Sequence, residues 1–302
     1  MHILLTGGTG LIGRGLCRRW SAEGHRLTVW SRDPGSVAAR CGEGVRGIGR
    51  LEDYGDDPLD AVVNLAGAGI ADRPWSQTRR ALLRASRLAL SKSLVAWLAQ
   101  RRSGPSLLLS GSAVGWYGDA GDAELDESSP PRDQGFASRL CADWERIALA
   151  AETAEMRVVV LRTGLVLARE GGFLARLLPP FRLGLGGRLG QGRQWMPWIH
   201  LADQIALIDF LLRHPQARGP YNACAPQPVR NRDFTRALAR ALGRPACLPL
   251  PAWLLKAGLG ELSGLLLGGQ RVVPLRALQA GFVFRFNTLE SALADLLSED
   301  AR

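Results

Sequence analysis

Residues 1–30 read MHILLTGGTGLIGRGLCRRWSAEGHRLTVW, and this stretch decides the fold class. The apolar run His2–Leu5 leads directly into glycines, which is typical of a buried parallel strand. From Leu11 onward apolar residues recur at helical spacing until Gly24, a common helix terminator. Arg26–Trp30 then predicts a second strand. A strand, a glycine turn, a helix and a strand predict the first half of a βαβ unit, and with it an α/β fold.

The turn itself is TGGTGLIG, with glycines at Gly7, Gly10 and Gly13. In such a turn one glycine permits the bend, one lets a diphosphate approach the backbone, and one allows close helix–strand packing. The helix N-terminus offers N–H groups and a partial positive charge to the same diphosphate. Because the required strands flank the turn, the pattern predicts a dinucleotide site. The alternative is a glycine-rich turn that binds nothing.

The residues after the second strand indicate which dinucleotide is bound. An NAD site normally places a carboxylate there to bind the ribose 2′-hydroxyl. This chain has Ser31 and Arg32 first, and Asp33 only afterwards. An arginine can hold a 2′-phosphate through paired charge-assisted hydrogen bonds, whereas a carboxylate would repel it. The sequence therefore favours NADP(H) over NAD(H), with the alternative that Arg32 lies in solvent and Asp33 binds the ribose.

The composition of the chain excludes several other classes of protein. Its 302 residues suffice for one large α/β domain or two smaller ones. With 46% hydrophobic and 22% charged residues, it is neither disordered nor fibrous as a whole. No apolar run reaches the ~18 residues of a membrane span. The net charge is +10, but the basic residues are scattered, so no nucleic-acid partner is expected.

Cysteine and histidine spacing exclude further kinds of site. The five cysteines show no C-x-x-C pair and the four histidines form no ligand pattern, so no metal site is predicted. A disulfide framework is not expected in a chain of this length. The N-terminal glycines come too early for a secretory signal peptide, so the expected location is cytoplasmic.

Further motifs carry a family resemblance. AVVNLA, SGSAVGWYG, RTGLVL and WIHLAD follow one another between Ala61 and Asp203. Together with the glycine turn they resemble the extended short-chain dehydrogenase/reductase superfamily, which contains the NAD(P)-dependent epimerases and dehydratases. The segments Phe181–Asp203, Pro220–Phe234 and Gly269–Phe284 are similar to an atypical epimerase-like family with its own C-terminal domain.

The resemblance, which covers residues 1 to about 297, implies an architecture. It implies a Rossmann-type doubly wound parallel sheet with a smaller C-terminal substrate lobe. The NADP-binding domain would take residues 1–168 and about 198–225. The substrate lobe would take about 169–197 and 226–302.

The resemblance also implies a path for the cofactor. The diphosphate would lie against Gly7, Gly8, Thr9, Gly10, Leu11 and Ile12. The remaining implied contacts are Ser31 and Arg32 at the adenosine ribose and its 2′-phosphate, Leu65 and Ala66 along the adenosine, Arg87 at a ribose or phosphate, and Leu165 at the nicotinamide. For Arg87 a surface helix position is the alternative.

The catalytic residues are where this chain departs from the superfamily. Active members use a tyrosine, a lysine four residues later and a serine. The lysine cation favours the phenolate and lowers a tyrosine pKa that is ordinarily about 10. This chain contains no Tyr-x-x-x-Lys. The family pattern places the pair at Phe136 and Leu140, which instead predict an apolar helix face.

Two residues remain as catalytic candidates. Ser112 matches the superfamily serine and is expected to donate a hydrogen bond, unless it only caps the turn after its strand. Tyr117, in the following loop, is a substitute acid, with aromatic packing as the alternative. Asp143-Trp144-Glu145 predicts helix surface around a buried indole. His200 is a weaker base candidate at an expected strand-to-helix boundary.

These observations predict an NADP(H)-binding epimerase- or oxidoreductase-like protein that acts on an unidentified small molecule. The alternative is a non-catalytic NADPH-sensing or scaffold protein, which the missing dyad suggests. No membrane partner is expected. The apolar stretch Pro249–Gly269 fits a helix pair of the lobe or a homodimer contact better than membrane attachment.

Overall fold

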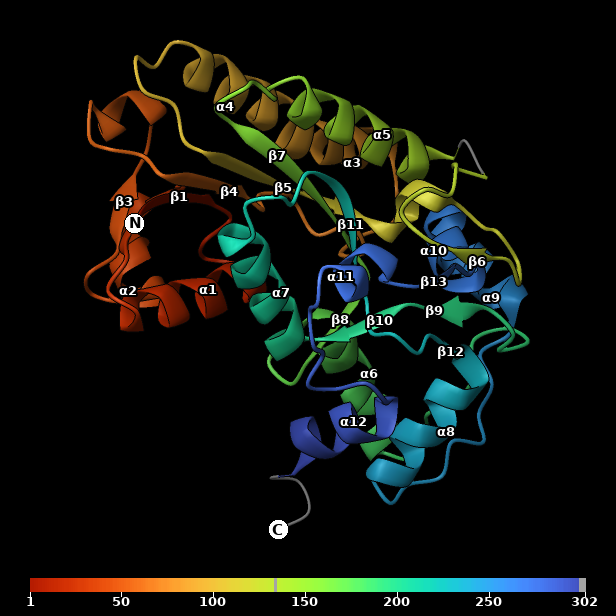
Figure 1. Cartoon of the computed structure of the whole chain (residues 1–302). Helices are drawn as coiled ribbons and strands as arrows, with labels where there is room; N and C mark the ends of the chain where they lie inside the picture. The colour runs from red at the N-terminus through yellow and green to blue at the C-terminus, as the bar shows by residue number, and fades with distance from the viewer. Residues whose placement is uncertain (133–134, 299–302) are drawn as a thin grey trace.

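The computed structural model describes residues 1–132 and 135–298. At its centre is a parallel sheet of seven strands in the order β11-β7-β5-β4-β1-β2-β3 (Figure 1). These strands are β1 (His2–Thr6), β2 (Arg26–Trp30), β3 (Arg46–Ile48), β4 (Ala61–Asn64), β5 (Leu107–Ala113), β7 (Arg157–Thr163) and β11 (Gly219–Ala223). The predicted Rossmann-type sheet is therefore confirmed, with crossover connections that leave its strands parallel.

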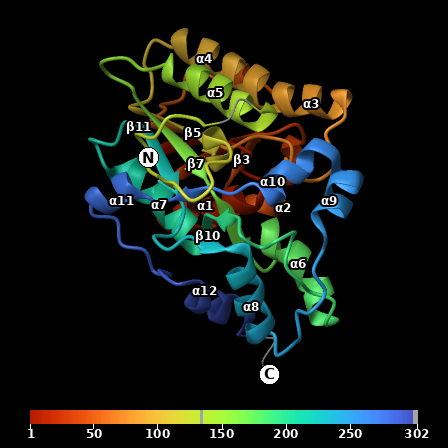
Figure 2. The same cartoon turned by 90° about the vertical axis from the view of Figure 1, so that its right-hand side faces the viewer.

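Helices cover both faces of the sheet (Figures 1 and 2). On one face lie α1 (Leu11–Ala22), α2 (Val37–Cys41) and α7 (Leu201–Arg213), and on the other α3 (Gln77–Arg84), α4 (Leu90–Ala99) and α5 (Phe136–Leu149). Ile3 and Leu5 of β1 pack in the cluster that contains α1, whereas Leu4 packs in the cluster that contains α4. Successive strand residues are thus buried on opposite faces, which explains the unbroken apolar run at the N-terminus.

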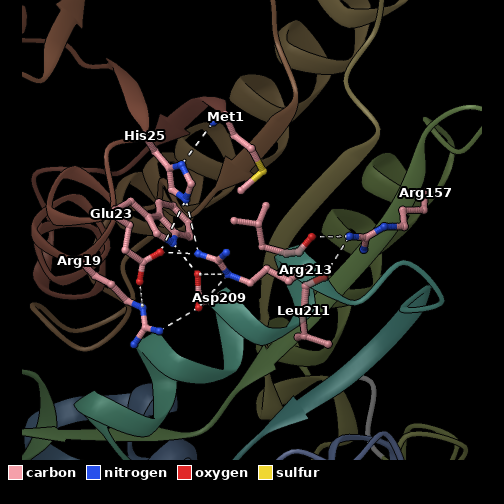
Figure 3. A network of polar contacts seen from close by, with 10 residues as sticks. Met1, Arg19, Glu23, His25, Arg157, Asp209, Leu211 and Arg213 are labelled. Atoms are coloured by element: carbon pink, nitrogen blue, oxygen red, sulfur yellow. Dashed lines mark hydrogen bonds and ion pairs between the residues drawn. The ribbon is translucent and has the colours of Figure 1, made fainter.

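A polar network fixes α7 against the first helix (Figure 3). The carboxylate of Asp209 accepts hydrogen bonds from Arg19 at 2.9 Å and from the Trp20 indole at 2.8 Å. Arg213 pairs with the same carboxylate at 3.2 Å. From β7, Arg157 donates to two backbone oxygens near the end of α7, at 2.7 and 3.1 Å. These bonds tie α7, which leads into β11, to both α1 and the sheet.

A second buried cluster lies beside the sheet. It is formed by β8 (Leu165–Ala168), α6 (Gly172–Arg182), β9 (Trp195–Met196), β10 (Trp198–His200), α8 (Asn231–Ala241) and α12 (Leu289–Leu297). β8 pairs with β10 in parallel, and β9 pairs with β12 (Val229–Arg230) antiparallel. The indole of Trp198 is fully buried in this cluster. The exact domain boundaries stay a prediction.

The C-terminal segment connects the two cores. It contains α9 (Ala252–Leu259), α10 (Gly264–Leu267), β13 (Arg271–Val272), which pairs with β6 (Glu124–Leu125), and α11 (Leu275–Gln279). Phe284 is buried in the sheet cluster and Phe286 in the second cluster. Between them, Asp203 accepts the backbone N–H groups of Arg285 at 2.9 Å and Phe286 at 3.0 Å. Within the described ranges, no helix has both the length and the apolar composition needed to cross a membrane.

Candidate active site

The glycine turn lies between the ends of two neighbouring strands. Thr6, the last residue of β1, is the register partner of Trp30 in β2 and of Asn64 in β4. Ser31-Arg32 and Leu65-Ala66 follow those partners directly, so both pairs flank the turn at the carboxyl edge of the sheet. This is the edge at which open α/β sheets bind ligands. The predicted adenosine and diphosphate contacts therefore lie next to one another.

The backbone of the turn requires its glycines. Gly7 has φ 70°, and a Cβ there would lie 2.8 Å from the backbone carbon and oxygen of Leu65. A Cβ on Gly13 would lie 2.3 Å from the Gly7 oxygen. Helix α1 begins after Gly10 with no side chain capping its first N–H groups. The glycines let a diphosphate group approach the backbone closely, and the uncapped N–H groups at the helix N-terminus can donate hydrogen bonds to it.

Arg32 is exposed beside this turn, and no acidic side chain of the described residues pairs with it. The hydroxyl of Ser31 bonds with the backbone of Asp33 at 3.2 Å, which shapes the loop after β2. The guanidinium is therefore available to an anionic group that lies over the end of β2. This arrangement fits a 2′-phosphate.

A cavity of about 310 Å³ opens at the carboxyl ends of β4, β5 and β7. Five of the predicted site residues line it: Ile12, Leu65, Arg87, Ser112 and Leu165. Most of its other walls are apolar, among them Ile70, Leu140, Trp144, Phe173, Trp195 and Leu266. The structure thus brings residues predicted for the diphosphate, the adenosine, a ribose or phosphate and the nicotinamide together with Ser112 around one chamber.

Arg87 enters the cavity from a π-helical turn, Ala85–Ala89, between α3 and α4. Its guanidinium donates to the backbone oxygens of Ala68 at 2.9 Å and Leu83 at 3.4 Å and lies over the Trp144 ring. Burial lowers the pKa of this guanidinium. Because these partners are neutral and no carboxylate of the described residues pairs with it, the charge is available to a polar or anionic ligand group.

Ser112 is buried in the cavity wall, and its hydroxyl donates to Glu145 Oε1 at 2.6 Å. Glu145 in turn forms a two-point ion pair with Arg162, at 3.0 Å from Nε and 2.9 Å from Nη2. The prediction that Asp143-Trp144-Glu145 is helix surface around a buried indole is correct for Trp144 and wrong for Glu145, which is 5% exposed. Glu145 stands four residues after the buried Cys141, and residues four apart share one face of a helix. This spacing was the sequence signal that Glu145 is buried.

Tyr117 lies outside the residues that line this cavity. Its side chain is fully buried, and its hydroxyl lies 2.7 Å from Asn222 Oδ1 and accepts from Arg162 at 3.1 Å. Burial raises the pKa of this phenol to about 12. Tyr117 therefore bonds to Arg162 and Ser112 bonds to its ion-pair partner Glu145, but only Ser112 lines the chamber. A catalytic role for Tyr117 stays an untested prediction.

His200 caps helix α7 instead of facing the cavity. Its Nδ1 accepts the Ala202 N–H at 3.0 Å, its Nε2 lies 3.3 Å from the Asp295 carboxylate, and its ring packs on Phe286. Burial lowers the pKa of the imidazole. The expected strand-to-helix boundary is confirmed at His200, and both polar contacts of the ring hold the second core together.

The sequence motifs place the C-terminal segment in the substrate lobe but do not identify which of its residues line the cavity. Leu265, Leu266 and Gln270 line the cavity. Gln194, from the loop before β9, donates to the Leu266 oxygen at 2.8 Å and fixes that wall. Leu140 also lines the chamber, so the apolar residue at the family's lysine position faces the site directly. No local sequence pattern predicts such contacts, because they join segments that lie far apart in the chain.

Comparisons with known proteins agree with this architecture. Residues 3–224 match the NAD dependent epimerase/dehydratase family, and residues 250–296 match a domain of unknown function, DUF1731. An epimerase family protein of Mycobacterium bovis is 39% identical over 294 residues, covering 96% of each chain. A chloroplastic homologue of SDR39U1 from Arabidopsis thaliana is 35% identical over 312 residues, covering 98% of this chain and 87% of its own.

A solved structure extends the comparison to three dimensions. The human epimerase family protein SDR39U1, crystallised with NADPH, superposes with a TM-score of 0.90 at 36% identity and 99% coverage of both chains. The similarity therefore includes the C-terminal segment as well as the sheet. On these grounds the chain belongs to the NAD-dependent epimerase/dehydratase family and carries the additional C-terminal domain, as its motifs predict.

Proposed function

We propose that this protein binds NADP(H) and acts as an epimerase- or oxidoreductase-like protein on a small molecule held in the cavity. The observation that carries the proposal is the glycine turn beside Arg32, whose charge no described acidic side chain neutralises. The NADPH in the crystals of human SDR39U1 supports it. Such a cofactor would supply or accept a hydride at its nicotinamide.

The residues of this chain have separate parts in the proposal. The turn Gly7–Ile12 holds the diphosphate, and Ser31 with Arg32 holds the adenosine ribose and its phosphate. Leu65 and Ala66 lie along the adenosine, Arg87 binds a ribose or phosphate oxygen, and Leu165 packs at the nicotinamide side. The apolar walls of the cavity exclude water from the reacting group.

The second candidate function is a non-catalytic NADPH sensor or scaffold. It is favoured by the buried Phe136 and Leu140, which stand where the family pattern has its proton-transfer pair. The cavity that the C-terminal segment helps to enclose favours the first proposal, because a sensor of the cofactor alone needs no pocket for a substrate.

Two measurements test the proposal. Calorimetric titration with NADPH and NADH should show tighter binding of NADPH, and absence of heat with either would refute cofactor binding. A screen of carbonyl compounds that follows NADPH absorbance then separates enzyme from sensor. Sustained substrate-dependent oxidation would eliminate the sensor, and its absence across the screen would favour it.

A further inference from the structure

The hydroxyl of Ser112 has a defined direction. A serine hydroxyl carries one proton and two acceptor lone pairs. The proton of Ser112 points to Glu145 Oε1 at 2.6 Å, a short distance typical of a charge-assisted hydrogen bond. A carboxylate in an ion pair can only accept, so Glu145 cannot return a proton to this bond. The atoms that Ser112 offers to the cavity are therefore its lone pairs.

The position of Glu145 is itself fixed. Arg162 contacts both carboxylate oxygens and stacks on the Trp116 ring at 3.6 Å. Arg162 and Ser112 are register partners on β7 and β5, so the sheet sets the spacing between them. Glu145, Arg162 and Ser112 are each no more than 5% exposed. Reversing the Ser112 hydroxyl would leave a buried carboxylate oxygen without one of its donors, which is costly.

The surroundings of Ser112 define what else a ligand meets. The Cys141 thiol is in contact with Ser112, but a thiol is a weak donor and burial raises its pKa to about 11. Leu140 and Trp144, from the same helix, form an apolar wall next to it. The cationic group of this cavity is Arg87, which the proposed function assigns to the cofactor. A ligand group beside Ser112 therefore meets the Ser112 acceptor and this apolar wall, while Thr163, Gln194, Asn231 and Gln270 also line the cavity.

We infer that Ser112, held as an acceptor by Glu145, selects an uncharged and largely apolar alcohol as the ligand of this cavity. A hydroxyl group brings the donor that Ser112 can accept, whereas a carbonyl presents a second acceptor to it. The inference deepens the proposed function by naming the alcohol as the form of the substrate that the cavity binds. It rests on that proposed function. It also reverses the expectation that Ser112 donates to a carbonyl.

Cyclohexanol and cyclohexanone test this selection, because they share a ring and differ in one donor. Their dissociation constants are measured by ligand-observed NMR on the full chain with tetrahydro-NADP, an analogue that cannot transfer hydride. Cyclohexanol should bind about fivefold more tightly, as expected for one neutral hydrogen bond. Equal affinities, a preference for the ketone, or binding of neither probe would overturn the inference.

Substitutions test whether the preference for cyclohexanol arises from Ser112 and Glu145. Ser112→Ala should bind both probes equally. In Glu145→Gln, Arg162 retains the amide oxygen, the amide N–H₂ donates to Ser112, and the preference should reverse toward cyclohexanone. A merely structural role of Glu145 would weaken both probes alike. Thr163→Val, which removes another hydroxyl from the cavity wall, is the matched control and should keep the wild-type preference.

The outcomes separate this inference from the proposed function. If Glu145→Gln does not fold, Ser112→Ala against Thr163→Val still decides, since neither removes a charge of the buried ion pair. If the cofactor titration fails, the proposed function fails, and the probes are titrated against the chain alone. A retained alcohol preference there would support the inference by itself, and equal affinities or a ketone preference there would refute it.

Discussion

Arg162 on β7 and Glu145 on α5 form an ion pair in the protein interior, with N–O distances of 3.0 and 2.9 Å. The pair joins the sheet to the helix that carries the apolar wall of the cavity. Ser112 bonds to the Glu145 carboxylate of this pair, and Tyr117 bonds to its Arg162 guanidinium. The geometry of the candidate site therefore depends on one buried electrostatic contact.

Breaking this pair should be strongly destabilising. Arg162→Met leaves Glu145 charged and buried without its partner, so the free energy of unfolding in urea should fall by about 3–5 kcal/mol. In the double variant Arg162→Met/Glu145→Leu no uncompensated charge remains, and the loss should be clearly smaller than the sum of the two single losses. Additive losses would contradict this account.

Gly7→Ala should damage both stability and cofactor binding. The added Cβ would lie 2.8 Å from the Leu65 backbone at φ 70°, so the turn must shift, at a cost of roughly 1–3 kcal/mol. Urea unfolding and NADPH titration measure the two effects. Gly44→Ala, where a Cβ meets nothing within 4 Å, is the control and should stay within about 0.5 kcal/mol of the parent. Equal effects at both positions would refute the steric argument.

Arg32→Ala should discriminate between the two cofactors. Loss of charge-assisted bonds to a 2′-phosphate should weaken NADPH binding by roughly 10- to 100-fold and leave NADH binding unchanged. Calorimetry with both dinucleotides checks this. Arg18→Ala, an exposed arginine farther along α1, should alter neither affinity. A parallel loss for NADPH and NADH would remove Arg32 from the phosphate site.

Tyr117→Phe should lower stability while NADPH affinity is retained. The change leaves Asn222 Oδ1 and one Arg162 N–H without a buried partner, at a cost of about 1–3 kcal/mol. The control is Tyr221→Phe, since no hydrogen bond from the Tyr221 hydroxyl is found within the described ranges. If both variants unfold at the same urea concentration, the network around Tyr117 contributes nothing to stability.

His200 should make stability depend on pH. Burial lowers the pKa of His200 below the ordinary 6.5. Just below that pH, His200 therefore binds a proton in the unfolded chain but stays neutral in the folded chain. The contribution is present above about pH 6.5 and is lost on acidification through the folded pKa. His200→Asn keeps a capping side chain and should weaken the dependence of the unfolding free energy on pH below about pH 6.5. His214→Gln, at the other end of α7, should retain the slope.

The local signals in this chain were strong enough to predict the sheet and the cofactor turn. The apolar run before Gly7, the helical spacing after it and the strand before Ser31 each depend on residues adjacent in sequence. Gly7 and Gly13 are required by contacts within the turn and with the neighbouring strand. Such patterns can be recognised in the sequence, because local backbone geometry requires these residue types at these positions.

The lining of the cavity was decided by packing between segments that lie far apart in the chain. Glu145 is a carboxylate on a helix, and its sequence context gives no sign of the arginine that makes its burial tolerable. Arg162 reaches it only because β5 and β7 pair in one register under α5. Leu266, from the C-terminal segment, lines the same cavity. A buried charge is stable only beside its partner, and that partner is chosen by the fold, not by neighbours in sequence.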